Sequence, residues 1–329
     1  MSAASAGRHT LIGGDDATRL DVFVATALDL SRNHAATLIA NGHVLVDGRR
    51  ERASYRARLG ETVVVDVPQP PGRDVSAESI PLHVVYEDDD ILVVNKAAGM
   101  VVHPAPGNWT GTLVNALKGR GGPLSGGTGE GREGIVHRLD KQTSGLLLVA
   151  KSDRAHRVLG AALQAREIRR RYVALSWGHL VDDQVSVDKP LARDPRDRTR
   201  VAVVAGGRGA RTDFVRLARF ESVDLLRAHL HTGRTHQIRV HLAAIGHPIV
   251  GDDTYGGGGG RKSLGLPPHR HFLHAAWLGF RHPVTGNELE FRASLPDDLT
   301  APLAIAAGED RAPAGTDPLE HFAFYRSLA

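Results

Sequence analysis

The sequence has no cysteine, so it can form no disulfide and no thiolate metal site, and it offers no cysteine nucleophile. It also has no apolar run long enough to span a bilayer, and residues 1–9 lack the apolar core of a signal peptide. These absences exclude thiol chemistry and favour a cytoplasmic protein without a membrane partner.

Motifs for nucleotide cofactors and metals are missing as well. The glycine-rich stretches 121–131 and 256–260 lack both the Gly-Lys-Ser/Thr ending of a phosphate-binding loop and the strand, turn and helix of a dinucleotide fingerprint. The chain has 18 histidines, but no pair shows the helical i, i+4 spacing with an intervening glutamate that marks zinc hydrolases. We therefore expect no nucleotide or other cofactor and no metal.

What the chain does have is enough length for two domains and an excess of arginine. Its 329 residues are 41% hydrophobic, which is ordinary for a globular protein, and its formal net charge is +4. The sequence pI of about 9.6 suits an anionic partner.

A proline cluster divides the chain. Prolines at 68, 70 and 71, followed by polar residues up to 79, mark the best linker in the sequence. We predict an N-terminal tail at 1–16, a small domain at 17–67, a linker at 68–79, a larger domain at 80–299 and a C-terminal extension at 300–329.

The small domain has the pattern of two helices followed by short strands. Residues 19–25 predict one helix, and a second is expected between a cap at Ser31 and a stop at Asn41-Gly42. Strands are predicted at 44–49 and 62–66. The sequence therefore indicates a small α+β unit.

Arginines are concentrated in this small domain. Residues 49–58 hold five arginines and one acid. A solvated face is the ordinary explanation of such a cluster. Arginine also suits bidentate contact to phosphate, and this density exceeds what solubility requires. We predict contact to the phosphates of an anionic partner by Arg32, Arg49, Arg50, Arg52, Arg56 and Arg58, and the resemblance given below implies that this partner is RNA.

In the larger domain strands dominate, with helices expected at about 113–118, 154–164 and 235–245, which suggests an α+β fold around a large sheet. Asp140 stands out there, because Arg138 and Lys141 flank it and apolar runs lie on both sides. The two cations favour its ionised form, and Thr143-Ser144-Gly145 predict a bend. An exposed turn with a surface ion pair and a buried active acid both fit this pattern.

Two long strings carry a resemblance to a known family. His137-Arg138-Leu139-Asp140-Lys141 with Thr143-Ser144-Gly145-Leu146-Leu147-Leu148 resembles the catalytic motif of the RluA/RsuA-type pseudouridine synthases. Residues 232–241, which read Thr-Gly-Arg-Thr-His-Gln-Ile-Arg-Val-His, resemble that family's second diagnostic block. The likeness also includes residues 86–96, 101–104, 251–252 and 273–275.

The small domain resembles an S4 RNA-binding domain, and an S4 domain joined to this catalytic block resembles the RluD-like branch of the family. One departure is Ala97-Ala98-Gly99, where the family often has proline after the lysine of its early motif.

The resemblance implies an enzyme that isomerises specific uridines to pseudouridine in structured RNA. It implies an α+β catalytic domain with a large mixed, mainly antiparallel sheet, preceded by the S4 domain. The expected partner is a stem-loop of ribosomal RNA in the large subunit or its precursor, with transfer RNA as the alternative. The reaction has no redox step, so one carboxylate can suffice without a cofactor.

Site residues follow from the same resemblance. Asp140 is implied to be catalytic, Arg239 to form its ion pair, and Tyr172 to stack on the uracil and assist in removing its proton. Arg138 is implied to help expose the target nucleotide. The remaining substrate-binding residues are Arg234, His236 and Leu273, although core packing explains Leu273 equally well.

Two other interpretations stay open. The chain could be a noncatalytic RNA-binding or ribosome-assembly protein, or a metal-dependent RNA hydrolase, which chelation would test. Asp140, Arg138, Tyr172 and Arg239 occurring together favour the synthase, because a protein that only binds RNA has no need of the full set.

Overall fold

The structure is a computed structural model, and it describes residues 7–14, 18–30, 32–67, 75–105, 107–126, 132–258 and 264–326. The chain divides into two compact units, Met1–Asp74 and Val75–Ala329, each of which is described by itself. In the described ranges, no helix has the length and apolar character that crossing a membrane requires.

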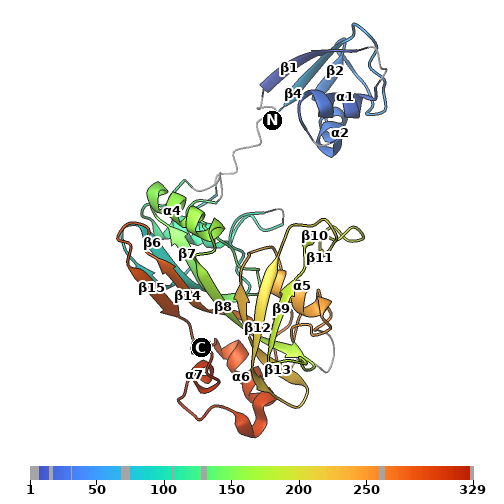
Figure 1. Ribbon diagram of the computed structural model, residues 1–329. Coiled ribbons are helices and arrows are strands. Elements are labelled where there is room, and N and C mark those ends of the chain that lie inside the picture. Colours follow the sequence, from blue (N-terminus) through green and yellow to red (C-terminus); the bar gives the residue numbers. More distant parts are fainter. Residues whose placement is uncertain are drawn as a thin grey trace. The chain divides into compact units, whose positions relative to one another are not determined.

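The N-terminal unit is a four-stranded sheet covered by two helices (Figure 1). Its strands, in spatial order β1-β4-β2-β3, and its helices are β1 (Gly7–Ile12), β4 (Thr62–Val67), β2 (Val44–Val46), β3 (Arg49–Arg50), α1 (Leu20–Ala27) and α2 (Arg32–Ala40). Valines of β4 pack against apolar side chains of α1 and α2, including Leu20, Val24 and Leu38. The predicted helix cap Ser31 lies outside the described residues.

Strand β1 was not expected, because it falls within the predicted tail at residues 1–16. It pairs antiparallel with β4 along its whole length, from Gly7 opposite Val67 to Ile12 opposite Thr62. Its own side chains are exposed or half-buried, so it lacks the apolar alternation that marks a strand in sequence. The backbone ladder to β4 is what holds it in the sheet.

The C-terminal unit is built on a nine-stranded sheet in which only the β7–β14 pair is parallel. The expected large, mixed, mainly antiparallel sheet is thus confirmed. The strands are, in spatial order, β5 (His83–Glu87), β6 (Ile91–Lys96), β7 (Ser144–Ala150), β14 (Leu273–Arg281), β8 (Arg169–Trp177), β13 (Val223–Leu230), β12 (Arg211–Arg219) and β9 (Gln184–Asp188), with β15 (Glu288–Arg292) paired to β14.

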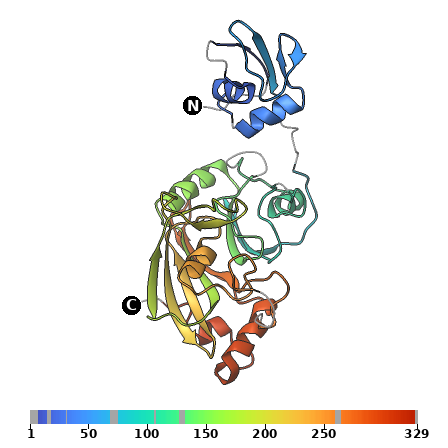
Figure 2. The same ribbon diagram turned by 90° about the vertical axis from the view of Figure 1, so that its right-hand side faces the viewer.

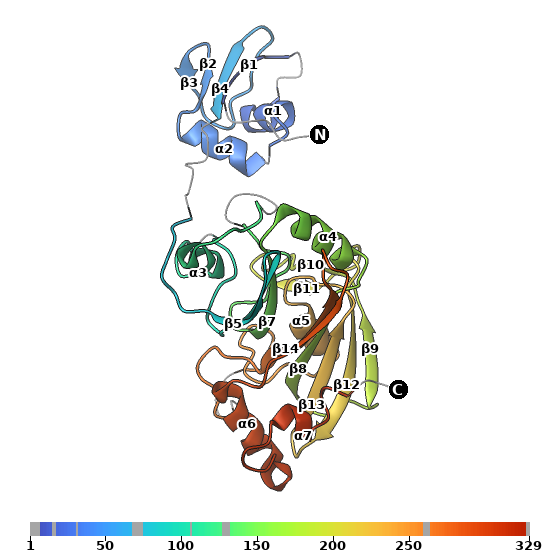
Figure 3. The same ribbon diagram turned by 90° about the vertical axis from the view of Figure 1, so that its left-hand side faces the viewer.

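Both faces of β7 are covered by helices. Leu146 and Leu148 pack with α4 (Asp153–Gln164), whereas Leu147 and Val149 pack with α3 (Leu113–Arg120), as the two-residue period of a strand requires (Figure 3). Side-chain oxygens of Thr112 and Ser152 cap the two helices. β7 is therefore a rigid central strand for the loop that precedes it.

The third predicted helix of this unit is α5 (Gln237–Ala244), which lies beside β11 and β12 (Figure 2). Strand β11 (Val201–Val203) forms a small two-stranded sheet with β10 (Leu191–Arg193). The N-terminus of α5 follows directly from the loop after β13, so strand and helix together fix that loop.

The two ends of the larger domain differ from the predicted boundaries. Val75 is buried in the main core, and Glu78 N donates to Asn115 O at 3.0 Å, so residues 75–79 belong to the C-terminal unit. Residues 68–74 of the predicted linker lie outside the described ranges.

At the other end, the predicted extension at 300–329 contains most of α6 (Asp297–Ala307), then a 3-10 turn (Gly308–Asp310) and α7 (Pro318–His321). Leu303, Leu319 and Phe324 are buried in the main core, so the described part of this segment is part of the unit.

Candidate active site

One pocket of the C-terminal unit gathers all the catalytic and substrate-binding residues proposed from the sequence. The loop before β7, the strands β8, β13 and β14, and the loop leading into α5 meet there. Its lining includes Arg138, Asp140, Tyr172, Arg234, His236, Arg239 and Leu273. Segments separated by more than a hundred residues thus bring their polar side chains to one place.

The loop before β7 directs Asp140 into the pocket. Leu139 is buried beneath it, and Thr143 N donates to Asp140 O at 3.1 Å to close a turn at Lys141 and Gln142. The bend therefore lies earlier than predicted, because Ser144 and Gly145 already pair with β14. A Cβ at Gly145 would lie 2.4 Å from Ala275 O, so only glycine permits this close approach.

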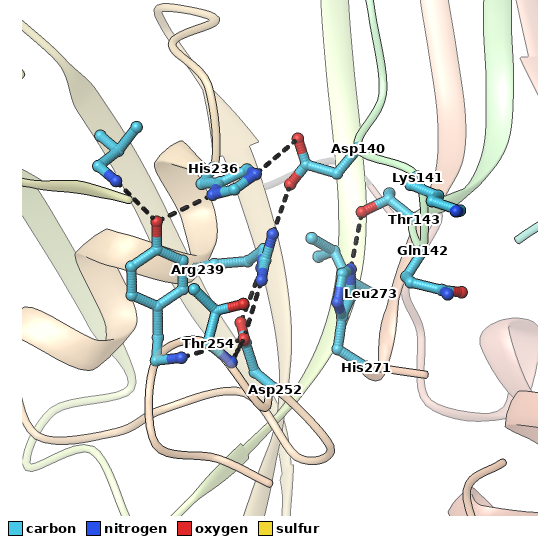
Figure 4. A network of polar contacts seen from close by, with 12 residues as sticks. Asp140, Lys141, Gln142, Thr143, His236, Arg239, Asp252, Thr254, His271 and Leu273 are labelled. Atoms are coloured by element: carbon cyan, nitrogen blue, oxygen red, sulfur yellow. Dashed lines mark hydrogen bonds and ion pairs between the residues drawn. The ribbon is translucent and has the colours of Figure 1, made fainter. Parts of the chain in front are cut away.

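Arg239 connects Asp140 to a second, fully buried carboxylate (Figure 4). Its Nε and Nη2 donate to the two oxygens of Asp252 at 2.7 and 2.9 Å, and its Nη1 donates to Asp140 Oδ2 at 3.2 Å. Asp252 Oδ1 also accepts the backbone N–H groups of Thr254 and Tyr255. The paired contacts fix the guanidinium plane, and that plane aims the remaining nitrogen at Asp140.

This arrangement keeps Asp140 ionised. Burial alone would raise its pKa, but the charges of His236, Arg239 and His271 and the hydrogen bond from Arg239 hold the pKa below its usual value. Burial lowers the pKa of His236, and it lowers that of His271 to about 3. The permanent charge of Arg239 is therefore the contribution that persists at neutral pH.

His236 faces the other oxygen of Asp140. Its Nδ1 lies 2.9 Å from the Tyr255 hydroxyl, and that oxygen accepts a bond from Val201 N at 3.2 Å. The Tyr255 hydroxyl thus bridges His236 Nδ1 and Val201 N, and the other ring nitrogen, Nε2, lies 3.9 Å from Asp140 Oδ1. His236 has a left-handed φ of 56°, a conformation that costs roughly 1–3 kcal/mol in a non-glycine residue and concentrates at functional sites.

Tyr172 and Leu273 provide the apolar wall of the pocket. Leu273 pairs with Ala174 and Ala275 pairs with Tyr172 across β14 and β8, so the two side chains share one face of the sheet. Burial raises the pKa of Tyr172, with the charge of Arg170 acting in the opposite direction, so its phenol is neutral. A flat ring can lie against these side chains with its edge near Asp140.

Sequence reasoning gave no role to several residues that shape this pocket. Asp252 lies in the matched pair Gly251-Asp252, but only the folded chain shows that it holds Arg239. Lys96, 1% exposed, donates to the carbonyls of Ala97, Met100 and Lys141 and so ties the loop after β6 to the turn beside Asp140. Burial lowers the pKa of Lys96 to about 7. In the sequence, the position of Lys96 at the end of an apolar strand was the signal that could have identified it.

The predicted RNA-binding arginines lie in the N-terminal unit. Arg49 and Arg50 form the exposed edge strand β3, and Arg52, Arg56 and Arg58 are exposed in the segment that follows. Arg32 differs, since its Nε donates to Asp21 Oδ2 at 3.0 Å, although most of its side chain is exposed.

Among the residues that the structure describes, no three His, Asp or Glu side chains are grouped so as to hold a metal ion.

Comparisons with known proteins agree on one family. The family model described as RNA pseudouridylate synthase matches residues 90–244 of the sequence, and the family model of the S4 domain matches residues 18–63. An uncharacterized RNA pseudouridine synthase of Chloroflexus aurantiacus is 51% identical, over 90% of this chain and 92% of its own. The ribosomal large subunit pseudouridine synthase D of Zymomonas mobilis is 44% identical, over 85% of this chain and 91% of its own.

A solved structure supports the same assignment. Human RNA pseudouridylate synthase domain containing 1 has a TM-score of 0.53 and 29% identity, covering 67% of this chain and 86% of that one. The matches to an RNA pseudouridylate synthase domain and an S4 domain in one chain define an RNA-modifying enzyme. The chain belongs to the RNA pseudouridine synthase family, and it isomerises uridines in RNA to pseudouridine.

Replacing Arg239 by leucine is expected to reduce both stability and turnover. Asp252 would remain buried without a cation, which should lower the unfolding free energy in urea by about 3–5 kcal/mol. Burial would then raise the pKa of Asp140, so turnover by the variant should fall between roughly pH 8 and pH 5, where the wild type stays ionised. In the wild type, the ion pair of Asp140 with Arg239 contributes its full stability above about pH 3.9, which is the pKa that Asp140 has in the unfolded chain. This stability is lost as the pH falls through the lower pKa that Asp140 has in the folded protein.

Arg234→Leu is the matched control, since Arg234 lines the same pocket and pairs with no carboxylate in the described chain. It should lose less than about 1 kcal/mol of stability and leave the pH profile unchanged. Equal losses of unfolding free energy and the same pH profile in both variants would contradict the role given to Arg239.

Proposed function

We propose that this enzyme converts specific uridines of large-subunit ribosomal RNA, with Asp140 as its catalytic group and without a cofactor. The observation that carries the proposal is the carboxylate of Asp140, which Arg239 holds ionised in a pocket lined by further arginines and by Tyr172 and Leu273. The choice of RNA rests on relatives named ribosomal large subunit pseudouridine synthase D, at 41–44% identity. Such a substrate places the enzyme's action in the cytoplasm.

One carboxylate acting at the sugar suffices for this chemistry. The bond between uracil N1 and C1′ breaks, the base turns, and C5 bonds to C1′. C5 then loses its proton and N1 gains one, so the product is an isomer of the substrate. Asp140 either bonds to the sugar carbon or accepts a sugar proton, and its ionised form serves both steps. No electron is gained or lost, so no redox partner enters the balance.

The other pocket residues hold the nucleotide during this change. The detached uracil lies against Tyr172 and Leu273, and the Tyr172 phenol assists in removing the C5 proton. Arg138 is exposed at the rim, where its guanidinium can fill the space that the target base vacates in the stem. Arg234 and His236 border the same space and position the sugar and its phosphate.

The central test maps pseudouridine by carbodiimide chemistry in total RNA from a strain lacking the gene, complemented with wild type or with Asp140→Asn. Sites in large-subunit RNA should disappear on deletion and return only with the wild type, because the amide has no charge with which to act at the sugar. Thermal unfolding of the purified variant checks that it folds.

An unchanged map, or full restoration by Asp140→Asn, would show that the carboxylate is not catalytic. If the lost site lies in transfer RNA, the synthase activity is upheld but the assignment of ribosomal RNA as the substrate is wrong.

The S4 domain is proposed to hold the RNA backbone through its arginines. Replacing Arg49, Arg50 and Arg52 together by glutamine should weaken RNA binding and reduce the slope of log Kd against log[KCl] by about 0.7–0.9 for each lost phosphate contact. The matched control carries the same loss of charge at exposed Arg196, Arg281 and Arg311. Equal binding by the two triple variants would reduce the cluster to a solvated face.

A further inference from the structure

A second hollow opens beside the active pocket. It has a volume of about 930 Å³ and is lined by α4, by the segment before the catalytic loop and by the loop after β13. Arg132, Arg157, Arg166 and Arg208 lie along it, and no aspartate or glutamate does within the described chain. Arg138, Arg170, Gly233 and Arg234 line both hollows, so the two are continuous. We call the second hollow the arginine groove.

Arg170 lies at the junction and is unlike the other buried arginines. It is 7% exposed, its Nε is buried without a hydrogen-bond partner, and no carboxylate in the described chain pairs with it. By contrast, Arg227 donates to Phe324 O at 2.9 Å, Arg239 to Asp252, and Arg270 to Asp298 at 2.7 Å. Arg170 alone among these four is left without an acceptor.

The fold holds this unpaired charge in place. Arg170 and Tyr172 are two residues apart on β8 and share one face, while Arg169 and Arg171 lie at the ring of Trp277. A Cβ at Gly233 would lie 3.1 Å from Arg170 Nη1, so the absence of a side chain there gives the guanidinium its room. A charge taken out of water without a partner is destabilising, and an anion that enters the hollow would supply the counter-charge that Arg170 lacks in the described chain.

We propose that Arg170 binds a phosphodiester of the RNA where the strand leaves the uridine pocket, and that the arginine groove holds the strand beyond it. This inference rests on the proposed function, because the ligand is the same RNA. A phosphate matches the planar donors of a guanidinium, and it would provide the anion that the protein itself lacks here. The groove continues the contact with further arginines and no opposing charge.

The test compares Arg170→Met with Arg169→Met, its exposed neighbour on the same strand. Binding of a large-subunit ribosomal RNA transcript is measured at increasing KCl, together with thermal unfolding. Arg170→Met should bind at least about 30-fold more weakly. Its log–log salt slope should be shallower by about 0.7–0.9. Its Tm should be unchanged or higher, because an unpaired buried charge is gone. Arg169→Met should bind within about threefold of wild type, as is typical of an exposed charge.

Arg170→Lys should keep the salt slope, since it keeps the charge. For the groove, Arg157→Gln should weaken binding, whereas Arg154→Gln, one turn earlier on α4 and outside the lining, should not.

The inference is overturned if Arg170→Met binds like Arg169→Met, or if it lowers Tm or fails to fold, since either of the latter makes Arg170 structural. Loss of turnover with unchanged binding and slope would also overturn it, by placing Arg170 at the base rather than at a phosphate. If the wild type converts no uridine but Arg170→Met still binds weakly with a shallower slope, the proposed function fails and the phosphate site stands.

Discussion

The active pocket depends on one guanidinium shared by two carboxylates. Asp252 takes the two parallel donors of Arg239 and is itself fixed by the backbone of the following turn, so the third nitrogen can point only at Asp140. A buried salt bridge adds little net stability, and the effect of this one is to orient Asp140 and keep it ionised. Without it, burial would favour the protonated form of Asp140, which lacks the charge that the proposed action at the sugar requires.

Three other residues around the pocket are also held in unusual environments. Lys96 uses three backbone carbonyls to join two loops, and it becomes easier to deprotonate because it is buried. Arg170 has no acceptor in the described chain, and His236 adopts a backbone conformation that side chains rarely take. The unpaired guanidinium and the left-handed backbone each cost the folded protein stability, and Arg170 and His236 both line the active pocket.

The contiguous motifs could be recognised from the sequence, whereas the contacts between distant segments could not. Asp140 and Arg239 lie in two strings that are informative by themselves, but Asp252 acquires its role only when the loop after α5 folds back on the helix. Nothing in the run Arg169-Arg170-Arg171 tells which arginine faces the pocket, because that depends on the phase of β8. Strand β1 escaped prediction since its side chains carry no apolar pattern and its partner β4 supplies the stability. The C-terminal segment likewise joins the core through widely spaced apolar residues without a readable period.

The role of the shared guanidinium is tested most directly by titrating the Asp140 carboxyl, followed by carbon NMR in the wild-type protein with selectively labelled aspartate and assigned by comparison with Asp140→Asn. With Arg239 in place, the group should stay ionised down through the ordinary aspartate value of about 3.9 and titrate below it. A titration above about pH 5 would mean that burial prevails over Arg239, and the proposed role of the shared guanidinium would be wrong.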